Sequence, residues 1–183
     1  MPATSAFDLH PHPSTPCAAV RGLRVQLDLT EDKPLALRYA LDADISQLRV
    51  PSATAPARTD GLWRHTCFEA FLAAGDSPAY YEVNLAPSSQ WAVYRFDSYR
   101  QGMASIPIAR APLIAPTVSS QGLELAAVVS FTDLPELRVG APLRVALAAV
   151  IETREGSLSY WALRHPAGKP DFHNAEGFVR ARK

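Results

Sequence analysis

The sequence predicts an all-β protein, a single domain built as an antiparallel β-sandwich. Three observations favour this fold class. Apolar and polar residues alternate with a period of two along much of the chain, no amphipathic helix pattern separates these segments, and sixteen prolines against nine glycines divide the chain into short pieces. Many short strands without helices between them are typical of a sandwich or barrel. A chain of 183 residues has the length of one such domain.

The alternation is clearest in four segments and recurs in four shorter ones. In residues 143–151, Leu143, Val145 and Leu147 fall on one face of an extended chain. Such a face predicts a strand that borders a core, and the whole set amounts to about nine strands. The long segments are 24–29, 35–42, 123–131 and 143–151, and the short ones are 66–73, 80–86, 90–96 and 157–163.

The remaining segments are expected to lie outside the strands. Residues 132–137 predict a helical turn, because proline interrupts the strand pattern there. Residues 51–60 and 103–118 are broken by prolines and predict long loops, which in a sandwich often shape a binding face. Residues 1–20 predict a partly mobile N-terminal extension, and residues 21–183 predict the sandwich domain.

Charge and composition exclude several classes of partner. Eighteen basic and eighteen acidic side chains leave no basic excess, so we expect neither nucleic acid nor an anionic membrane as a partner. The N-terminus lacks the basic and apolar regions of a secretory signal, and no apolar stretch has the length of a membrane span. We therefore expect a cytoplasmic protein whose two cysteines, Cys17 and Cys67, are reduced. No pattern specifies an oligomeric state.

The densest group of polar and aromatic residues lies in the middle of the chain. The sequence Gly75–Pro78 is a turn signal between two expected strands, which should form an antiparallel hairpin. In that hairpin Glu69 would lie near Glu82 or Asn84 on one face. We expect Glu82 or Glu69 to lie within ion-pair reach of Arg95 in the following strand, or of another arginine, because carboxylates inside a sandwich need partners.

Two separated motifs carry a family resemblance. The first comprises Phe68-Glu69-Ala70-Phe71-Leu72 and Tyr81-Glu82-Val83-Asn84, and the second comprises Tyr160-Trp161-Ala162, Pro170-Asp171-Phe172-His173 and Gly177-Phe178. In this order they resemble family 9 carbohydrate-binding modules and the related DOMON-like domains. The resemblance spans about residues 60 to 180 and is strongest to small stand-alone bacterial proteins. It implies a jelly-roll β-sandwich, immunoglobulin-like in outline, that binds a sugar or, in some relatives, haem.

The resemblance implies that two tryptophans hold the sugar between them, and these correspond to Trp63 and Trp161. A pyranose ring has an apolar face that stacks on an indole ring, while polar side chains bind its hydroxyl groups. Trp91 is a third aromatic candidate. For each of the three tryptophans, a place in the hydrophobic core is the alternative.

Five polar residues are candidates for binding the hydroxyl groups. Carboxylate, amide and guanidinium groups on neighbouring strands could recognise a sugar, or they could form a buried ion-pair network. A histidine in the second motif adds a further donor or acceptor. The candidates are Glu69, Glu82, Asn84, Arg95 and His173.

Catalysis is not expected. Two carboxylates on adjacent strands could reach the separation of about 5–5.5 Å that a retaining glycosidase needs. However, an arginine beside them would keep a carboxylate ionised instead of raising its pKa. The sequence also has no nucleophile elbow, phosphate-binding loop, dinucleotide fingerprint, HExxH or CxxC motif. The pattern therefore favours a non-catalytic protein whose partner is a small sugar.

Two further alternatives remain open at this point. Met103, with His165 or His173, supplies the thioether and imidazole groups that bind a b-type haem iron. Asp76 and Asp171 are expected in loops where members of the family can hold a structural calcium ion. The chain could also be a structural or interaction domain that has the fold but binds no small ligand.

Overall fold

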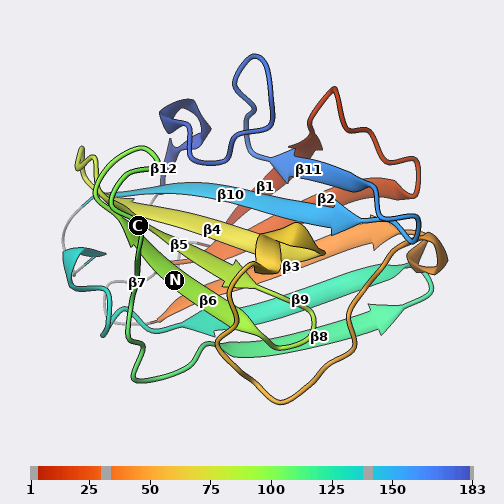
Figure 1. Cartoon of the computed structure of the whole chain (residues 1–183), viewed down its shortest axis with the longest axis horizontal. Coiled ribbons are helices and arrows are strands. Elements are labelled where there is room, and N and C mark those ends of the chain that lie inside the picture. Colours follow the sequence, from red (N-terminus) through yellow and green to blue (C-terminus); the bar gives the residue numbers. More distant parts are fainter. Residues whose placement is uncertain (1–3, 30–33, 138–141, 182–183) are drawn as a thin grey trace.

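The computed structural model describes residues 4–29, 34–137 and 142–181, and these form a β-sandwich (Figure 1). This confirms the expected fold class and all eight of the expected strand segments. The strands are β1 (Thr4–Pro11), β2 (Val20–Asp28), β3 (Leu35–Ala43), β4 (Cys67–Ala74), β5 (Tyr80–Leu85), β6 (Trp91–Phe96), β7 (Ala104–Ser105), β8 (Leu113–Ser119), β9 (Gly122–Val129), β10 (Leu143–Glu152), β11 (Leu158–Ala162) and β12 (Val179–Arg180). The short 3-10 helices are η1 (Ile45–Gln47), η2 (Leu62–Arg64), η3 (Pro135–Leu137) and η4 (Ala175–Gly177).

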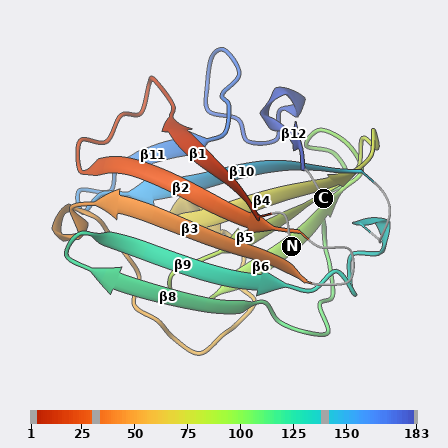
Figure 2. The ribbon, with the colours of Figure 1, turned by 180° about the vertical axis from the view of Figure 1, so that it is seen from behind.

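One curled ladder of antiparallel strands makes both layers of the sandwich. Its order is β7-β6-β5-β4-β10-β11-β1-β2-β3-β9-β8, and β12 pairs with β10. Sheet A contains β1, β2, β3, β9 and β8, which face the viewer in Figure 2. Sheet B contains β4 to β7 and β10 to β12, and its main strands face the viewer in Figure 1.

The N-terminal segment, expected as an extension, contains strand β1. Its first part, Thr4–Leu9, pairs with β2 in sheet A, and its last residues, His10 and Pro11, pair with β11 in sheet B. Leu9 is only 3% exposed and belongs to the core. The prediction of an extension over residues 1–20 was wrong for β1. Phe7 and Leu9 are the only two apolar side chains on the inward face of this strand, and two residues give too short an alternation to predict a strand.

Residues 103–118, expected as a long loop, contain most of strand β8. It lies at the edge of sheet A, and among the described strands it pairs only with β9. A proline cannot donate a hydrogen bond to a neighbouring strand, so strands that contain proline belong at sheet edges. Pro116 has this place, opposite Leu125. The helical turn expected over residues 132–137 is present as η3.

The main core lies between the two sheets. Alternate residues of β2 and β3, such as Val25 and Tyr39, meet inward residues of sheet B, such as Leu147. Burying a side chain of this size contributes about 1.5–3 kcal/mol. The Tyr39 hydroxyl group spans the core and donates a hydrogen bond of 2.8 Å to the backbone carbonyl of Glu69, so it also ties sheet A to β4.

Sheet B is buried on its outer face as well. Every residue of β5 is buried, and a second apolar cluster, which includes Phe71, Tyr80 and Phe96, covers that face. Trp63 and Phe178, from segments outside sheet B's long strands, pack against this cluster. The outer face of sheet A carries exposed cross-strand ion pairs instead, for example Arg24 with Asp8. The two faces therefore differ, and the enclosed one can hold a site.

The cysteines and the helices add two simple findings. Cys17 and Cys67 are both free thiols, as expected. Burial, followed by the nearby Glu69 carboxyl group, raises the pKa of Cys67 well above its ordinary value, so this thiol is unreactive. Among the described residues, no helix has the length and apolar character needed to cross a bilayer.

Candidate ligand-binding site

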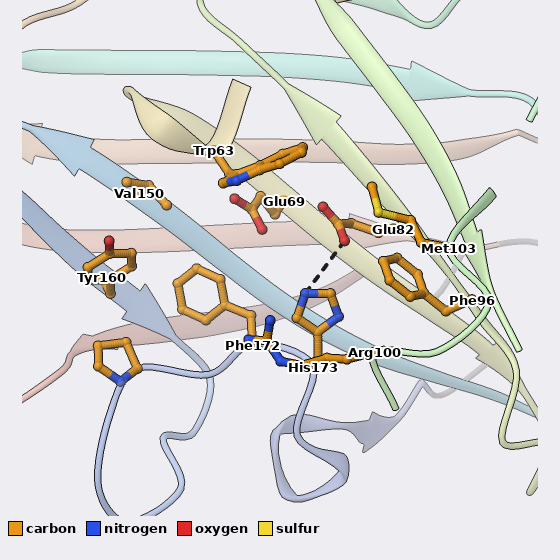
Figure 3. A pocket seen from close by; sticks show the side chains of 11 residues that line it. Trp63, Glu69, Glu82, Phe96, Arg100, Met103, Val150, Tyr160, Phe172 and His173 are labelled. Atoms are coloured by element: carbon orange, nitrogen blue, oxygen red, sulfur yellow. Dashed lines mark ion pairs between the residues drawn. The ribbon is translucent and has the colours of Figure 1, made fainter. Parts of the chain in front are cut away.

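A pocket of about 340 Å³ opens on the outer face of sheet B (Figure 3). Its floor is made by residues of β4, β5, β6, β10 and β11, and its walls come from η2, from the turn after β6 and from the segment between β11 and β12. This volume lies within the range of small-molecule sites. The residues that line it are Trp63, Glu69, Glu82, Phe96, Arg100, Met103, Val150, Tyr160, Pro170, Phe172 and His173.

Two buried carboxyl groups lie on the floor of the pocket. Glu69 is directly opposite Asn84 in the β4–β5 pairing, so Glu69, Glu82 and Asn84 share one face, as expected. Glu82 Oε1 accepts a hydrogen bond of 2.7 Å from Asn84 Nδ2. Glu69 Oε1 is buried and has no hydrogen-bond partner among the described residues.

Burial determines the protonation of both carboxyl groups. Desolvation, and then the charge of Glu82, raise the pKa of Glu69 well above its ordinary value. Desolvation also raises the pKa of Glu82, although the hydrogen bond from Asn84 and the charge of Arg100 oppose this. A pair of close carboxyl groups in a low-dielectric site is most stable when it retains a proton. The floor of the pocket can therefore both donate and accept hydrogen bonds.

His173 connects this floor to the wall of the pocket. Its Nδ1 lies 2.8 Å from the Tyr80 hydroxyl group, and its Nε2 lies 3.7 Å from Glu82 Oε2. Tyr80 accepts a hydrogen bond of 3.3 Å from the backbone N–H of Arg100, so its own proton is free to bind Nδ1. Burial, together with the charge of Arg100, lowers the pKa of His173 to about 4. At neutral pH the imidazole is uncharged, and this arrangement directs its Nε2–H toward Glu82.

A bridge between two surface segments holds the rim of the pocket. Asp171 accepts hydrogen bonds from the Tyr99 hydroxyl group at 2.7 Å and from the Arg100 guanidinium at 2.8 Å. It also accepts one from the backbone N–H of His173 at 3.1 Å. Although burial opposes the shift, these donors lower the pKa of Asp171. The turn after β6 and the C-terminal segment are thus joined beside His173.

Aromatic rings form the walls above the carboxyl groups. In Figure 3 the indole ring of Trp63 and the ring of Phe172 lie on opposite sides of the Glu69 carboxyl group. Trp63 packs edge-to-face on Tyr94, with ring centroids 5.8 Å apart. Phe172 packs edge-to-face on Tyr160 at 5.9 Å. Both half-buried rings are supported from behind and present an apolar surface to the pocket.

The structure does not bring Trp161 to this pocket. Trp161 pairs with Ala149 on the inward side of sheet B, is 4% exposed, and donates from Nε1 to Ser159 Oγ at 3.0 Å. The expected Trp63–Trp161 clamp is therefore wrong. Successive residues of a strand point to opposite faces, so Tyr160, and not Trp161, faces the pocket.

The predictions that Trp91 and Arg95 belong to the binding site are wrong for the same geometric reason. Both lie on the side of β6 opposite the pocket, and Trp91 is part of the main core. Arg95 is paired with Asp97 and, at 2.9 Å, with Glu136. Among the described residues neither Glu82 nor Glu69 forms an ion pair with an arginine, so the expected pairing is wrong. The residue opposite Glu82 on β6 is Tyr94, and Arg95 points to the other face.

Of the predicted site residues, Trp63, Glu69, Glu82 and His173 line this pocket. Asn84 does not line it and contacts it only through its hydrogen bond to Glu82. Sequence reasoning missed several wall residues, although Phe172 and Tyr160 lie inside the second motif, each next to a residue that was chosen. Phe96 and Val150 could have been found only from the strand register. The missed residues are Phe96, Arg100, Val150, Tyr160, Pro170 and Phe172.

Comparison with solved structures shows that the fold of this chain is a known one. A candidate carbohydrate-binding protein from Bacteroides uniformis is 12% identical, with a TM-score of 0.69 over 98% of this chain and 85% of that chain. A family 9 carbohydrate-binding module from Caldicellulosiruptor kristjanssonii, in complex with glucose, is 10% identical, with a TM-score of 0.53 over 94% of this chain and 82% of that one. The chain has the fold of a family 9 carbohydrate-binding module.

A family 9 module from the same organism, in complex with cellotriose, is 10% identical, with a TM-score of 0.50 over 90% of this chain and 75% of that chain. No protein-family profile and no curated protein sequence matches the chain. At these identities the likeness establishes the family 9 fold. The site on this family 9-like domain rests on its own residues, and the DOMON likeness remains a prediction.

The residues considered for haem do not fit an iron ligand set. His165 contacts His12 outside the pocket, and its Nε2 lies 2.8 Å from the backbone carbonyl of His10. Met103 and His173 both line the pocket, but both nitrogens of His173 already face protein groups, as described above. An axial ligand needs a free imidazole nitrogen.

The aspartates considered for calcium do not fit either. The Asp171 carboxylate is occupied by Tyr99 and Arg100. Asp76 lines a different cavity. Within residues 4–29, 34–137 and 142–181, no group of three or more His, Cys, Asp or Glu side chains could hold a metal ion. Calcium needs six to eight oxygen ligands.

Proposed function

We propose that this protein is a non-catalytic carbohydrate-binding module whose sugar site is the pocket on the outer face of sheet B. One observation carries the proposal. The Glu69 carboxyl group is 3% exposed, and its Oε1 has no hydrogen-bond partner among the described residues although it faces a pocket. An unpaired buried polar atom costs about 1–3 kcal/mol, so a ligand that supplies a hydrogen bond there is stabilised.

A sugar matches both the polar floor and the apolar walls. Its hydroxyl groups each donate one hydrogen bond and accept others, as do the protonated carboxyl groups at Glu69 and Glu82. Its apolar ring face suits the rings of Trp63 and Phe172, which flank the floor. The shared fold with a family 9 module solved in complex with glucose supports this assignment.

Binding fits the carboxyl groups better than hydrolysis does. A retaining glycosidase needs one ionised carboxylate as a nucleophile beside one protonated acid. Here burial raises the pKa of both Glu69 and Glu82, and Glu82 already accepts a hydrogen bond from Asn84. We therefore expect no release of nitrophenol from p-nitrophenyl glycosides.

Titration with neutral sugars tests the proposal. Glucose, galactose, mannose and xylose, and their short oligomers, should be followed by tryptophan fluorescence and calorimetry, because Trp63 lies in the wall of the pocket. At least one series should bind with a dissociation constant in the micromolar to millimolar range. Trp63→Ala should weaken that binding at least about tenfold, through loss of stacking.

Trp161→Phe is the matched control, because Trp161 is a core tryptophan on the opposite face of sheet B. This variant should bind as the unmodified protein does. If no sugar in the panel gave a saturable signal, or if Trp63→Ala bound as tightly as Trp161→Phe, the assignment of this pocket would be wrong.

A further inference from the structure

Glu69 and Glu82, the two buried carboxyl groups of the pocket, have no cationic partner at neutral pH. Within residues 4–29, 34–137 and 142–181, neither forms an ion pair with an arginine or a lysine. The basic group beside them is His173, whose Nε2 lies 3.7 Å from Glu82 Oε2. Burial lowers the pKa of His173 to about 4, so its imidazole is uncharged at neutral pH. The floor of the pocket therefore holds two acidic groups that no described side chain neutralises.

The positive charge of Arg100, which also lines the pocket, is taken up at the rim. Its guanidinium forms an ion pair with the Asp171 carboxylate at 2.8 Å. Burial raises the pKa of Glu82, and the hydrogen bond from Asn84 together with the charge of Arg100 only partly opposes this. Arg100 and Asp171 thus compensate each other, and the acidic groups on the floor remain in excess.

The strand register places these two carboxyl groups around one space. Glu69 lies opposite Asn84 in the β4–β5 pairing, and Glu82 is two residues from Asn84 along β5. Such diagonal neighbours are about 7–8 Å apart, a distance that two glutamate side chains can span toward one ligand group. Both carboxyl groups lie in the same pocket in Figure 3. Glu82 Oε1 already accepts from Asn84, whereas Glu69 Oε1 has no partner among the described residues.

Aromatic side chains stand beside this acidic pair. Trp63 and Phe172 line the pocket together with the two carboxyl groups. The face of an aromatic ring attracts a cation that lies within about 6 Å of its centroid. Among the described residues, the arginines that lie over rings use Tyr94, Tyr99 and Phe178, and none lies over Trp63 or Phe172. The two pocket rings are therefore free to contact a cation on a ligand.

An ammonium group suits this floor better than a hydroxyl group does. It is positively charged and has three N–H donors, whereas a hydroxyl group is neutral and has one donor. Hydrogen bonds between charged groups are roughly twice as strong as those between neutral groups. A carboxyl group that holds a proton in the free protein releases it to solvent when the ammonium group takes its place. The bound cation then removes the cost of burying the carboxylate charge.

From this arrangement we infer that the ligand is an amino sugar, whose protonated amino group binds between Glu69 and Glu82 while its ring lies against Trp63 and Phe172. The inference rests on the proposed function and names the class of sugar. It requires the positive charge of the ligand to strengthen binding, and it requires the two carboxyl groups to supply that gain.

Calorimetry with matched sugars tests the inference at about pH 6.5, where an amino group of ordinary basicity is protonated. The pairs are glucose and glucosamine, galactose and galactosamine, and mannose and mannosamine. In at least one pair the amino sugar should bind at least about tenfold more tightly than the neutral sugar. The N-acetyl form of that amino sugar keeps the nitrogen but is uncharged, and it should lose the gain.

Two variants identify the source of the gain. Glu69→Gln combined with Glu82→Gln keeps the size of both side chains and an acceptor for Asn84 but removes both acidic groups. In this protein the ratio of the two affinities should be close to one. Glu176→Gln is the matched control, because Glu176 is exposed and does not line the pocket. It should keep the ratio of the unmodified protein.

The possible results separate the inference from the proposed function. Equal affinity for the amino and the neutral sugar in all three pairs, or an unchanged ratio in the double glutamine variant, overturns the inference and leaves the sugar pocket intact. Cyclohexylamine binding as tightly as the amino sugar overturns the assignment to a sugar, because the amino group alone would then account for binding. If neither neutral nor amino sugars bind, the proposed function itself fails.

Discussion

At the scale of single residues, the chemistry of the site depends most on Glu69. Its carboxyl group is buried beside a second carboxyl group, and no cation within the described residues pairs with it. An isolated buried carboxylate is so costly that the group takes up a proton instead. The protonated form offers an O–H donor as well as acceptors, which a sugar hydroxyl group can match.

A pH dependence of stability follows from the raised pKa of Glu69. The native state holds a proton that the unfolded chain releases above about pH 4.3, so the free energy of unfolding falls as pH rises from there to the folded-state pKa. Glu69→Gln cannot titrate, and its free energy of unfolding should fall less over this range. Urea denaturation at pH 4, 6 and 8 measures the difference.

Glu155→Gln in the turn between β10 and β11 is the control, because its side chain is exposed and forms no ion pair with a described residue. This variant should follow the pH dependence of the unmodified protein. If Glu69→Gln did the same, Glu69 would be ionised in the folded protein, contrary to the expectation.

Trp63 and Trp161 should respond oppositely to truncation. Trp161→Ala removes a core side chain and should lower the free energy of unfolding by about 3–5 kcal/mol. Trp63→Ala removes a half-buried wall residue and should cost much less stability, although it weakens ligand binding. Denaturant titration of the two variants separates these roles. Equal loss of stability would place both rings in the core.

At the scale of elements, the turn after β6 determines where Arg100 and Met103 lie. Arg100 has a φ of 53° and Gly102 a φ of 65°, both in the left-handed region. A Cβ atom on Gly102 would lie 2.0 Å from Asp97 Oδ2. Glycine is therefore required at position 102 by both conformation and space.

Gly102→Ala should destabilise the protein by more than Gly156→Ala. Gly156 also has a positive φ, of 87°, but a Cβ atom there would have no neighbour within 4 Å. The control should therefore show the conformational cost alone, about 1–2 kcal/mol. Thermal unfolding measures both, and Gly102→Ala should also weaken sugar binding because the turn carries Arg100. Equal destabilisation would mean that Asp97 moves away freely.

At the scale of the whole molecule, β1 joins the two layers. It pairs with β2 through six residues and with β11 through two, so the continuity of the curled ladder passes through it. Leu9 lies close to the point where the strand passes from one sheet to the other, and it is buried. The N-terminal residues of β1 are thus part of the sandwich.

Leu9→Ala should lower the free energy of unfolding by about 2–5 kcal/mol, as a large-to-small change in a core does. Asp8→Ala, at the neighbouring exposed position of the same strand, should change stability little. Chemical denaturation checks both variants. A Leu9→Ala protein as stable as Asp8→Ala would mean that β1 contributes no core packing.

The sequence by itself determined the fold class, eight strand segments and the shared face of Glu69, Glu82 and Asn84. These features depend on periodicity and on a short hairpin, which are local. Strands β1 and β8 were missed because few apolar residues mark them or because prolines interrupt them. Their pairing is supplied by distant partners, which no local pattern contains.

Only the tertiary structure decided which aromatic residues reach the pocket. Tyr160 and Trp161 are neighbours in sequence, but the pairing of β11 with β10 sends one to the pocket and the other to the core. A shift of one residue in register would exchange them. Phe172 and Arg100 reach the same site from segments about seventy residues apart, joined through Asp171. Contacts of this kind depend on how the whole chain packs. The interaction energy that holds the pocket wall arises between residues that are close in space, and closeness in space is not given by position in the sequence.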